Sequence, residues 1–166
     1  MKHLAIFSAA AALALPLSAC GLQPMYAGGG RGAVAQGLGA VTVPAIEGQS
    51  GWLMRNALSD RMAAGGTSSP LYRLDVRLDD KLQGLGLLSD DTVTRERRTL
   101  RARYQLVELS SGKIMLDATA GSDAGIDVVS SEYAVIAGEQ TALENLTREV
   151  ADQIVSRVAL RLRQGK

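Results

Sequence analysis

Histidine and cysteine are almost absent from this chain of 166 residues, which contains one of each. Both lie near the N-terminus, as His3 and Cys20. The remainder of the chain can form neither a Ser-His or Cys-His nucleophile pair nor an ordinary zinc site. We therefore expect no enzymatic activity, no metal site and no other cofactor.

The chain also lacks a strong charge of either sign, since 18 lysine and arginine residues balance 17 aspartate and glutamate residues. A nucleic-acid-binding protein usually carries a basic excess that neutralises phosphates. We therefore expect no nucleic-acid partner.

The N-terminus has the pattern of a secretion signal. The first three residues carry positive charge, and residues 4–17 form an apolar run. That run is too short to cross a bilayer, which takes roughly 20 residues. Leu17-Ser18-Ala19-Cys20 then places small side chains directly before the cysteine. We expect residues 1–19 to be removed as a signal peptide.

Cys20 is the expected attachment point of a lipid. Residues 17–20 resemble a bacterial lipobox, in which diacylglycerol alkylates the cysteine thiol before cleavage. The alternative is ordinary cleavage that leaves Cys20 as a free thiol, which would be a liability in an oxidising compartment. Because Gly21 stands where aspartate commonly retains bacterial lipoproteins at the inner membrane, we expect the outer membrane.

Residues 20–39 are rich in glycine, and we interpret them as the lipidated cysteine and a flexible tether. Residues 40–166 are expected to form a single domain. The expected order is β-α-β-β-β-α, an α+β fold or α/β sandwich with two helices packed on one face of a four-stranded mixed sheet. The predicted elements are strands at 41–43, 71–82, 92–109 and from 114, and helices at about 50–63 and 131–163.

Periodicity also predicts which side chains form the core. Gly138 weakens the expected start of the last helix. The residues expected to face inward are Met54, Leu58 and Met62 in the first helix, Leu100, Ala102, Tyr104 and Leu106 in the third strand, Ile114, Leu116, Ala118 and Ala120 in the fourth, and Leu143, Leu146, Val150, Ile154 and Val158 in the last helix.

Four arginines of the third strand are the candidate binding residues: Arg95, Arg97, Arg101 and Arg103. Alternation places them on the outer face, where like charges repel unless a negative group answers them. One reading is that Asp75 and Asp79 of the neighbouring strand answer them. The other is that a polyanion does, because guanidinium groups bind phosphate bidentately. Lipid phosphate is the polyanion that suits a lipid-anchored protein.

Residues Leu85 to Leu88 are apolar and lie between the second and third strands. They insert into a partner or lipid on one reading, and they prolong the strands or tuck under the sheet on the other. The aromatic residues Trp52, Tyr72, Tyr104 and Tyr133 are interpreted as core or interface packing.

Several segments together resemble the LPS-assembly lipoprotein family LptE in its alphaproteobacterial form, over nearly the whole mature chain. No segment is decisive alone, but their order and spacing are specific. They are the lipobox followed by Cys20-Gly21-Leu22-Gln23-Pro24-Met25-Tyr26, the strand Tyr72-Arg73-Leu74-Asp75-Val76, the arginine-rich strand ending Tyr104-Gln105-Leu106, Ser111-Gly112-Lys113, and the helix opening Ser131-Glu132-Tyr133-Ala134 with Glu139 and Ala142.

The resemblance implies an outer-membrane lipoprotein that faces the periplasm, plugs the lumen of the LptD barrel, helps that barrel assemble and aids delivery of lipopolysaccharide (LPS) to the outer leaflet. Its implied partners are LptD, LPS and, through the lipid anchor, the outer membrane. The four arginines would then contact LPS. The alternative is an auxiliary periplasmic lipoprotein of an ABC-type or MCE-type lipid-transport system.

Replacement of Cys20 by alanine should give a folded protein that is released or mislocalised, because the lipid is attached outside the expected core. The measurement is fractionation of membranes, combined with inhibition of lipoprotein signal peptidase in the wild type. If the inhibitor causes no precursor to accumulate, the lipobox interpretation is wrong.

Overall fold

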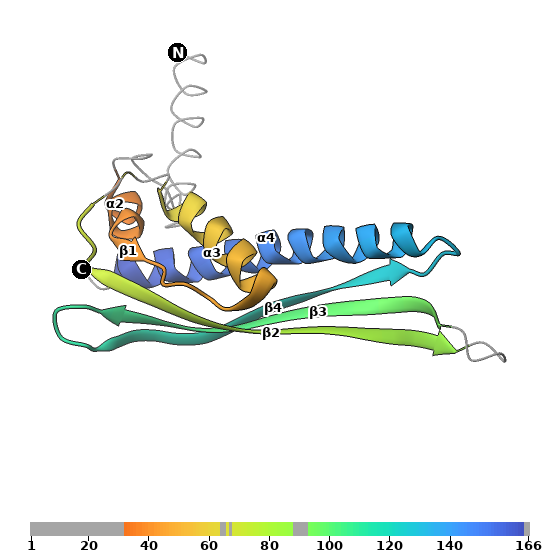
Figure 1. Cartoon of the computed structure of the whole chain (residues 1–166). Coiled ribbons are helices and arrows are strands. Elements are labelled where there is room, and N and C mark those ends of the chain that lie inside the picture. The colour runs from red at the N-terminus through yellow and green to blue at the C-terminus, as the bar shows by residue number, and fades with distance from the viewer. Residues whose placement is uncertain (1–31, 64–65, 67, 88–92, 165–166) are drawn as a thin grey trace, which may run out of the picture.

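The computed structural model describes residues 32–63, 66, 68–87 and 93–164. All the helices in this part of the chain lie on one side of a single long sheet (Figure 1). The elements in chain order are α2 (Ala33–Gly39), β1 (Val41–Thr42), α3 (Gly48–Ala63), β2 (Tyr72–Leu87), β3 (Val93–Glu108), β4 (Ile114–Asp127) and α4 (Glu132–Gln164). The predicted α+β fold and its β-α-β-β-β-α order are confirmed, with α2 as an additional helix.

The sheet is mixed, in the order β1-β2-β3-β4, with β1 parallel to β2 and the other pairs antiparallel. Successive residues of a strand point to opposite faces, so the alternating sequence divides the sheet into an apolar and a charged face. The apolar face lies under the helices. The residues of β3 that were expected to face inward, Leu100, Ala102, Tyr104 and Leu106, are all buried.

A β-bulge changes the expected start of β4. Leu106 lies opposite Leu116 and Val107 opposite Ile114, so Met115 is an extra residue in this strand. The bulge shifts the alternation by one residue. Met115 therefore packs against the core, whereas Ile114, which we expected to face inward, is 52% exposed.

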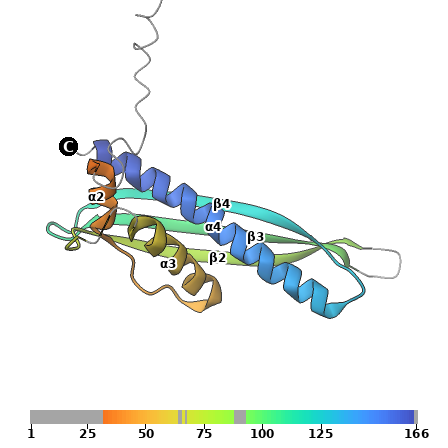
Figure 2. The ribbon, with the colours of Figure 1, turned by 90° about the horizontal axis from the view of Figure 1, so that it is seen from above.

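Helix α4 runs the length of the sheet and covers β3 and β4 (Figure 2). Its five predicted core residues, from Leu143 to Val158, are all buried. Gly138 does not interrupt the helix. A Cβ atom there would lie 3.3 Å from Cγ2 of Ile126, so the glycine lets α4 approach β4 closely.

Helix α3 lies beside α4 over the β2 side of the sheet (Figure 2). It begins at Gly48, two residues before the predicted start, and its expected stripe of Met54, Leu58 and Met62 is buried. Arg61 of α3 donates to Asp152 of α4 at 2.5 Å, which holds the pKa of that carboxyl below its ordinary value. The two helices are therefore joined by apolar contacts and by an ion pair.

The prediction of a flexible tether up to residue 39 was wrong for its last seven residues, which form α2. Val34, Ala35 and Leu38 of this helix are buried, and Gly37 lies against Leu162 near the end of α4. A helix this short is marginal by itself, so its packing against α4 stabilises it. Residues 1–31, which include the predicted signal peptide and Cys20, lie outside the described residues.

Replacement of Leu38 by alanine should lower the free energy of unfolding by about 2–5 kcal/mol, because a side chain that is 2% exposed leaves a cavity between α2 and α4. Leu71→Ala is the matched control, since Leu71 is 59% exposed, and its effect should be within about 0.5 kcal/mol. The measurement is urea unfolding. Equal stability of wild type and Leu38→Ala would restore the tether interpretation.

Candidate functional site

The uncovered face of the sheet carries a dense array of charges, which we call the outer face. It is formed by alternate residues of β2, β3 and β4, and none of the described helices covers it (Figure 1). Its basic members are Arg73, Arg77, Lys81, Arg95, Arg97, Arg101 and Arg103, and its acidic members are Asp75, Asp79, Asp117, Asp123 and Asp127.

Three of the four candidate arginines form ion pairs with aspartates of β4. The nitrogen–oxygen distances are 3.1 Å for Arg95–Asp127, 3.9 Å for Arg97–Asp123 and 3.0 Å for Arg103–Asp117. Hydrogen bonds from Arg103 and then from Gln105 hold the pKa of Asp117 below its ordinary value. These pairs join β3 to β4 across the outer face.

The reading that Asp75 and Asp79 neutralise the arginines of β3 was wrong about the partners. Asp75 pairs with Arg73 at 2.8 Å and Asp79 with Lys81 at 2.8 Å, in both cases within β2. Each aspartate therefore answers a cation two residues away on its own strand. Arg95, Arg97 and Arg103 of β3 pair with aspartates of β4 instead.

Arg101 and Arg77 differ from the other outer arginines, because neither has a carboxylate within ion-pair distance among the described residues. Arg101 lies opposite Gly121, and its side chain occupies the space that a Cβ there would fill, at 2.7 Å from Cδ. Arg77 lies directly opposite Arg103. Two guanidinium groups without an ion pair thus lie near the middle of the outer face, where the register sets Asp79 opposite Arg101.

A shallow polar cavity of about 330 Å³ lies at this place, lined by Asp75, Arg77, Arg103 and Gln105. Two guanidinium groups and an amide can donate hydrogen bonds into it, and one carboxylate can accept them. The arrangement is suited to an anionic or strongly polar ligand.

The sheet also carries a partly buried charged pair on its helix-covered face, which sequence reasoning missed. Arg98 donates to both carboxylate oxygens of Asp80, at 2.9 and 2.7 Å, and to the Glu139 carbonyl oxygen at 3.0 Å. The pair links β2, β3 and α4. Alternation places Asp80 and Arg98 on the inner face, so the sequence pattern could have predicted that both side chains lie on the helix-covered side.

Glu96 lies near this pair, and its Oε2 atom is buried without a hydrogen-bond partner among the described residues. Burial raises the pKa of Glu96 above its ordinary value, and the nearby Glu139 raises it further. A raised carboxyl pKa means that the folded state favours the protonated form. The stability contributed by Glu96 is therefore present at low pH and is lost as pH rises through its folded pKa.

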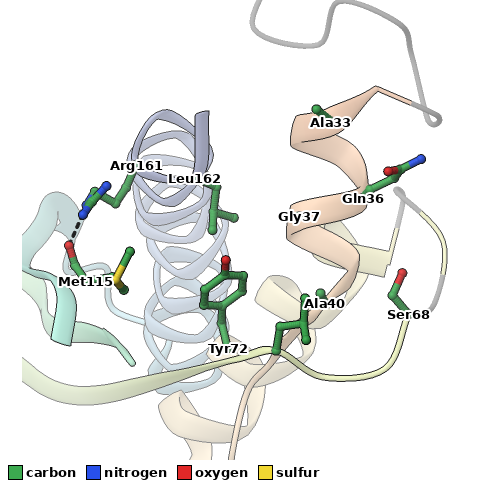
Figure 3. Close-up of a pocket in the computed structure, with 10 residues that line it drawn as sticks. Ala33, Gln36, Gly37, Ala40, Ser68, Tyr72, Met115, Arg161 and Leu162 are labelled. Atoms are coloured by element: carbon green, nitrogen blue, oxygen red, sulfur yellow. Dashed lines mark hydrogen bonds between the residues drawn. The ribbon is translucent and has the colours of Figure 1, made fainter. Parts of the chain in front are cut away.

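A second cavity, of about 320 Å³, lies between α2, the end of α4 and the start of β2. Figure 3 shows Tyr72 and Leu162 pointing into the space beside α2, with Arg161 at its rim donating to the Met115 carbonyl oxygen at 2.7 Å. Sequence reasoning missed this cavity because one of its walls is α2.

The remaining candidate residues have mixed outcomes. Leu85 and Leu87 belong to β2, which confirms that they prolong the strand, and Leu88 lies outside the described residues. Tyr104 is buried as expected. Trp52 and Tyr133 are not in the core, since they are 63% and 83% exposed.

The described residues contain neither a membrane-spanning helix nor a cluster of metal ligands. No helix there is both long enough and apolar enough to cross a membrane. Histidine, cysteine and carboxylate side chains in this part of the chain form no group of three or more that could hold a metal ion.

One comparison with known proteins identifies a family. Residues 38–158 match the model of the LptE family, which is described as lipopolysaccharide-assembly. No curated protein matches the sequence.

Several solved structures share the fold. A protein described as a lipoprotein, from Caulobacter crescentus, is 25% identical with a TM-score of 0.69, and the match covers 81% of this chain and 98% of that one. A minor lipoprotein from Acinetobacter baumannii is 18% identical with a TM-score of 0.57, covering 72% and 88%. Rare lipoprotein B from Shewanella oneidensis is 10% identical with a TM-score of 0.54, covering 76% and 98%.

Replacement of Arg98 by glutamine should lower the free energy of unfolding by about 1–3 kcal/mol, because it leaves the partly buried Asp80 carboxylate without its charged partner. Arg101→Gln is the matched control on the same strand and the opposite face, and should change stability by less than about 0.5 kcal/mol. Chemical unfolding of both variants gives the comparison. Equal losses would mean that the two faces contribute alike to folding.

Proposed function

This chain belongs to the LptE family of lipopolysaccharide-assembly lipoproteins, and we propose that it is an outer-membrane lipoprotein that plugs the lumen of the LptD barrel. In this proposal it faces the periplasm, is held to the membrane through lipidated Cys20, helps LptD to assemble and aids delivery of LPS to the outer leaflet. We infer an assembly role and no catalytic activity.

The observation that carries the proposal is the uncovered outer face of the sheet. A face of this length and charge would be costly to bury against an apolar surface, because each desolvated charge needs a partner. The interior of an outer-membrane barrel is polar and can supply such partners. Basic and acidic side chains alternate on the outer face, which suits a wall that also carries both signs.

The position of α2 supports a lipid anchor at one end of the molecule. Helix α2 is the first described element and packs against the C-terminal end of α4 (Figure 1). A helix of 33 residues extends about 50 Å, so the start of α4 lies far from that end. Val129, Tyr133 and Ile136 are exposed near this far end and offer apolar contacts to a partner.

The partner proposal is tested by purifying the native lipoprotein from membranes and identifying what accompanies it. We expect an outer-membrane barrel whose complex with this protein resists SDS without boiling. Recovery of an MCE protein in its place would support the auxiliary lipid-transport alternative and would contradict the plug.

The LPS contact is proposed for Arg95, Arg97, Arg101 and Arg103, with Arg101 as its most available member. Arg101 has no carboxylate partner within the described part of the chain, whereas the other three would have to share or exchange theirs. The structural pairs and the ligand therefore compete for the same guanidinium groups.

Arg101→Gln should weaken LPS binding more than Arg95→Gln does, and replacement of all four arginines by glutamine should weaken it most. Binding should fall as salt rises, because screening lengths shorten to about 8 Å at physiological ionic strength. The measurement is titration of the purified protein with LPS at two salt concentrations, with melting temperature as the folding control. Equal binding by wild type and the four-fold variant would assign these arginines to structural or barrel contacts.

A further inference from the structure

The sheet ends at β4, whose outer backbone edge has no neighbouring strand in the described part of the chain. In an antiparallel pair, successive residues point their N–H and C=O groups alternately toward the partner strand and away from it. Gln153 of α4 hydrogen-bonds both the N–H and the C=O of Gly121, at 3.4 Å each, so Gly121 points away from β3. By alternation, Asp123, Gly125 and Asp127 do so as well.

Helix α4 caps the first half of this edge. Besides Gln153, Arg157 donates to the Thr119 carbonyl oxygen at 3.2 Å and Arg161 to the Met115 carbonyl oxygen at 2.7 Å. These three side chains are spaced by four residues, which is about 6 Å along a helix, and two residues of a strand cover about 6.8 Å. Gln153 and Arg157 therefore keep step with the outward groups of Gly121 and Thr119. Arg161 reaches Met115 at the bulge, four strand residues beyond Thr119, so this stripe of α4 skips Asp117.

The same stripe continues toward the start of α4 as Glu149, Asn145 and Thr141, but there the capping stops. Glu149 accepts from the Ser122 hydroxyl at 3.0 Å, and Thr141 donates to the Ala137 carbonyl oxygen at 2.8 Å. Asn145 accepts from Arg148. None of the three forms a hydrogen bond to the backbone of residues 123–127.

A groove of about 530 Å³ lies between this uncapped half and α4. Its charged lining residues are Asp123, Asp127 and Glu149, all acidic. Asp123 and Asp127 each pair with an arginine of β3 through one carboxylate oxygen, and both side chains are more than half exposed, so the second oxygen of each can accept from a further cation. The groove therefore has backbone donors and acceptors on one side and negative charge along its rim. These are the features of a site that binds a basic strand.

We propose that residues 123–127 of β4 form a strand-addition site for an extended segment of a partner protein, with lysine or arginine at two positions four residues apart. The two cations would lie opposite Asp123 and Asp127, on the same face of the enlarged sheet. The residue between them would lie opposite Gly125, where a Cβ would meet nothing within 4 Å, so a large side chain fits there. This inference stands apart from the identity of the barrel partner.

A second copy of this chain does not suit the edge. Antiparallel pairing of two β4 edges about Gly125 would set Asp123 of each copy opposite Asp127 of the other. Like charges directly opposite are destabilising. Charge complementarity therefore selects a basic segment from a different protein.

The test uses the full chain as the cell processes it, purified in detergent, and the peptide acetyl-Thr-Lys-Thr-Tyr-Thr-Lys-Thr-amide. Nuclear magnetic resonance titration should shift the amides of Asp123, Gly125 and Asp127. Gly125→Pro removes an outward N–H without touching the pairing to β3, and should weaken binding at least about tenfold. Gly125→Ala keeps the N–H and should bind within about twofold of wild type.

A second variant changes a residue of α4 that faces the open half of the β4 edge. Asn145→Arg extends the capping stripe onto the open half of the edge and should also weaken the peptide at least about tenfold, with β4 unchanged. A peptide with glutamate in place of lysine should not bind. The proposal is overturned if the lysine peptide fails to bind wild type at millimolar concentration, if Gly125→Pro binds as wild type does, or if the glutamate peptide binds equally well.

Discussion

The packing of α4 on β3 and β4 is the interaction on which the rest of this structure depends. Val150, Ile154 and Val158 of α4 have no exposed surface, and burying each such side chain contributes about 1.5–3 kcal/mol. Helices α2 and α3 dock onto α4 and onto each other, and α3 also contacts β2 of the sheet. Because every described helix gathers on this side, the opposite face of the sheet is left uncovered and must be polar.

The charges of the outer face contribute little to folding and much to recognition. Exposed ion pairs such as Arg95–Asp127 are worth about 0–1 kcal/mol each, so they balance the face without fixing the fold. The pair between Arg98 and Asp80 has the opposite character, since it joins β2, β3 and α4 and is far less exposed to water than the pairs of the outer face. Position on the sheet, and not residue type, therefore decides which arginine is structural and which remains available to a ligand.

The sequence predicted most of the fold because a period of two residues separates the faces of a strand and a period of 3.6 separates the faces of a helix. It failed where a tertiary contact decides the outcome. Helix α2 is too short to be stable alone, and the bulge that exposes Ile114 adds a residue that alternation cannot anticipate. The sequence also did not predict the ion-pair partners of the outer arginines, because strand register determines which aspartate a guanidinium reaches.

The two halves of the β4 edge are protected differently, and the side chains of α4 explain the difference. Where α4 carries Gln153, Arg157 and Arg161, long polar side chains reach the edge of β4 and take the place of a further strand. Twelve residues earlier in each case, the stripe holds Thr141, Asn145 and Glu149, which are shorter or acidic and bond elsewhere. An unpaired sheet edge invites pairing with another chain, and natural proteins usually block it. Since this helix bonds the backbone of β4 at Gly121, Thr119 and Met115, the open half is the part of the edge available to a partner.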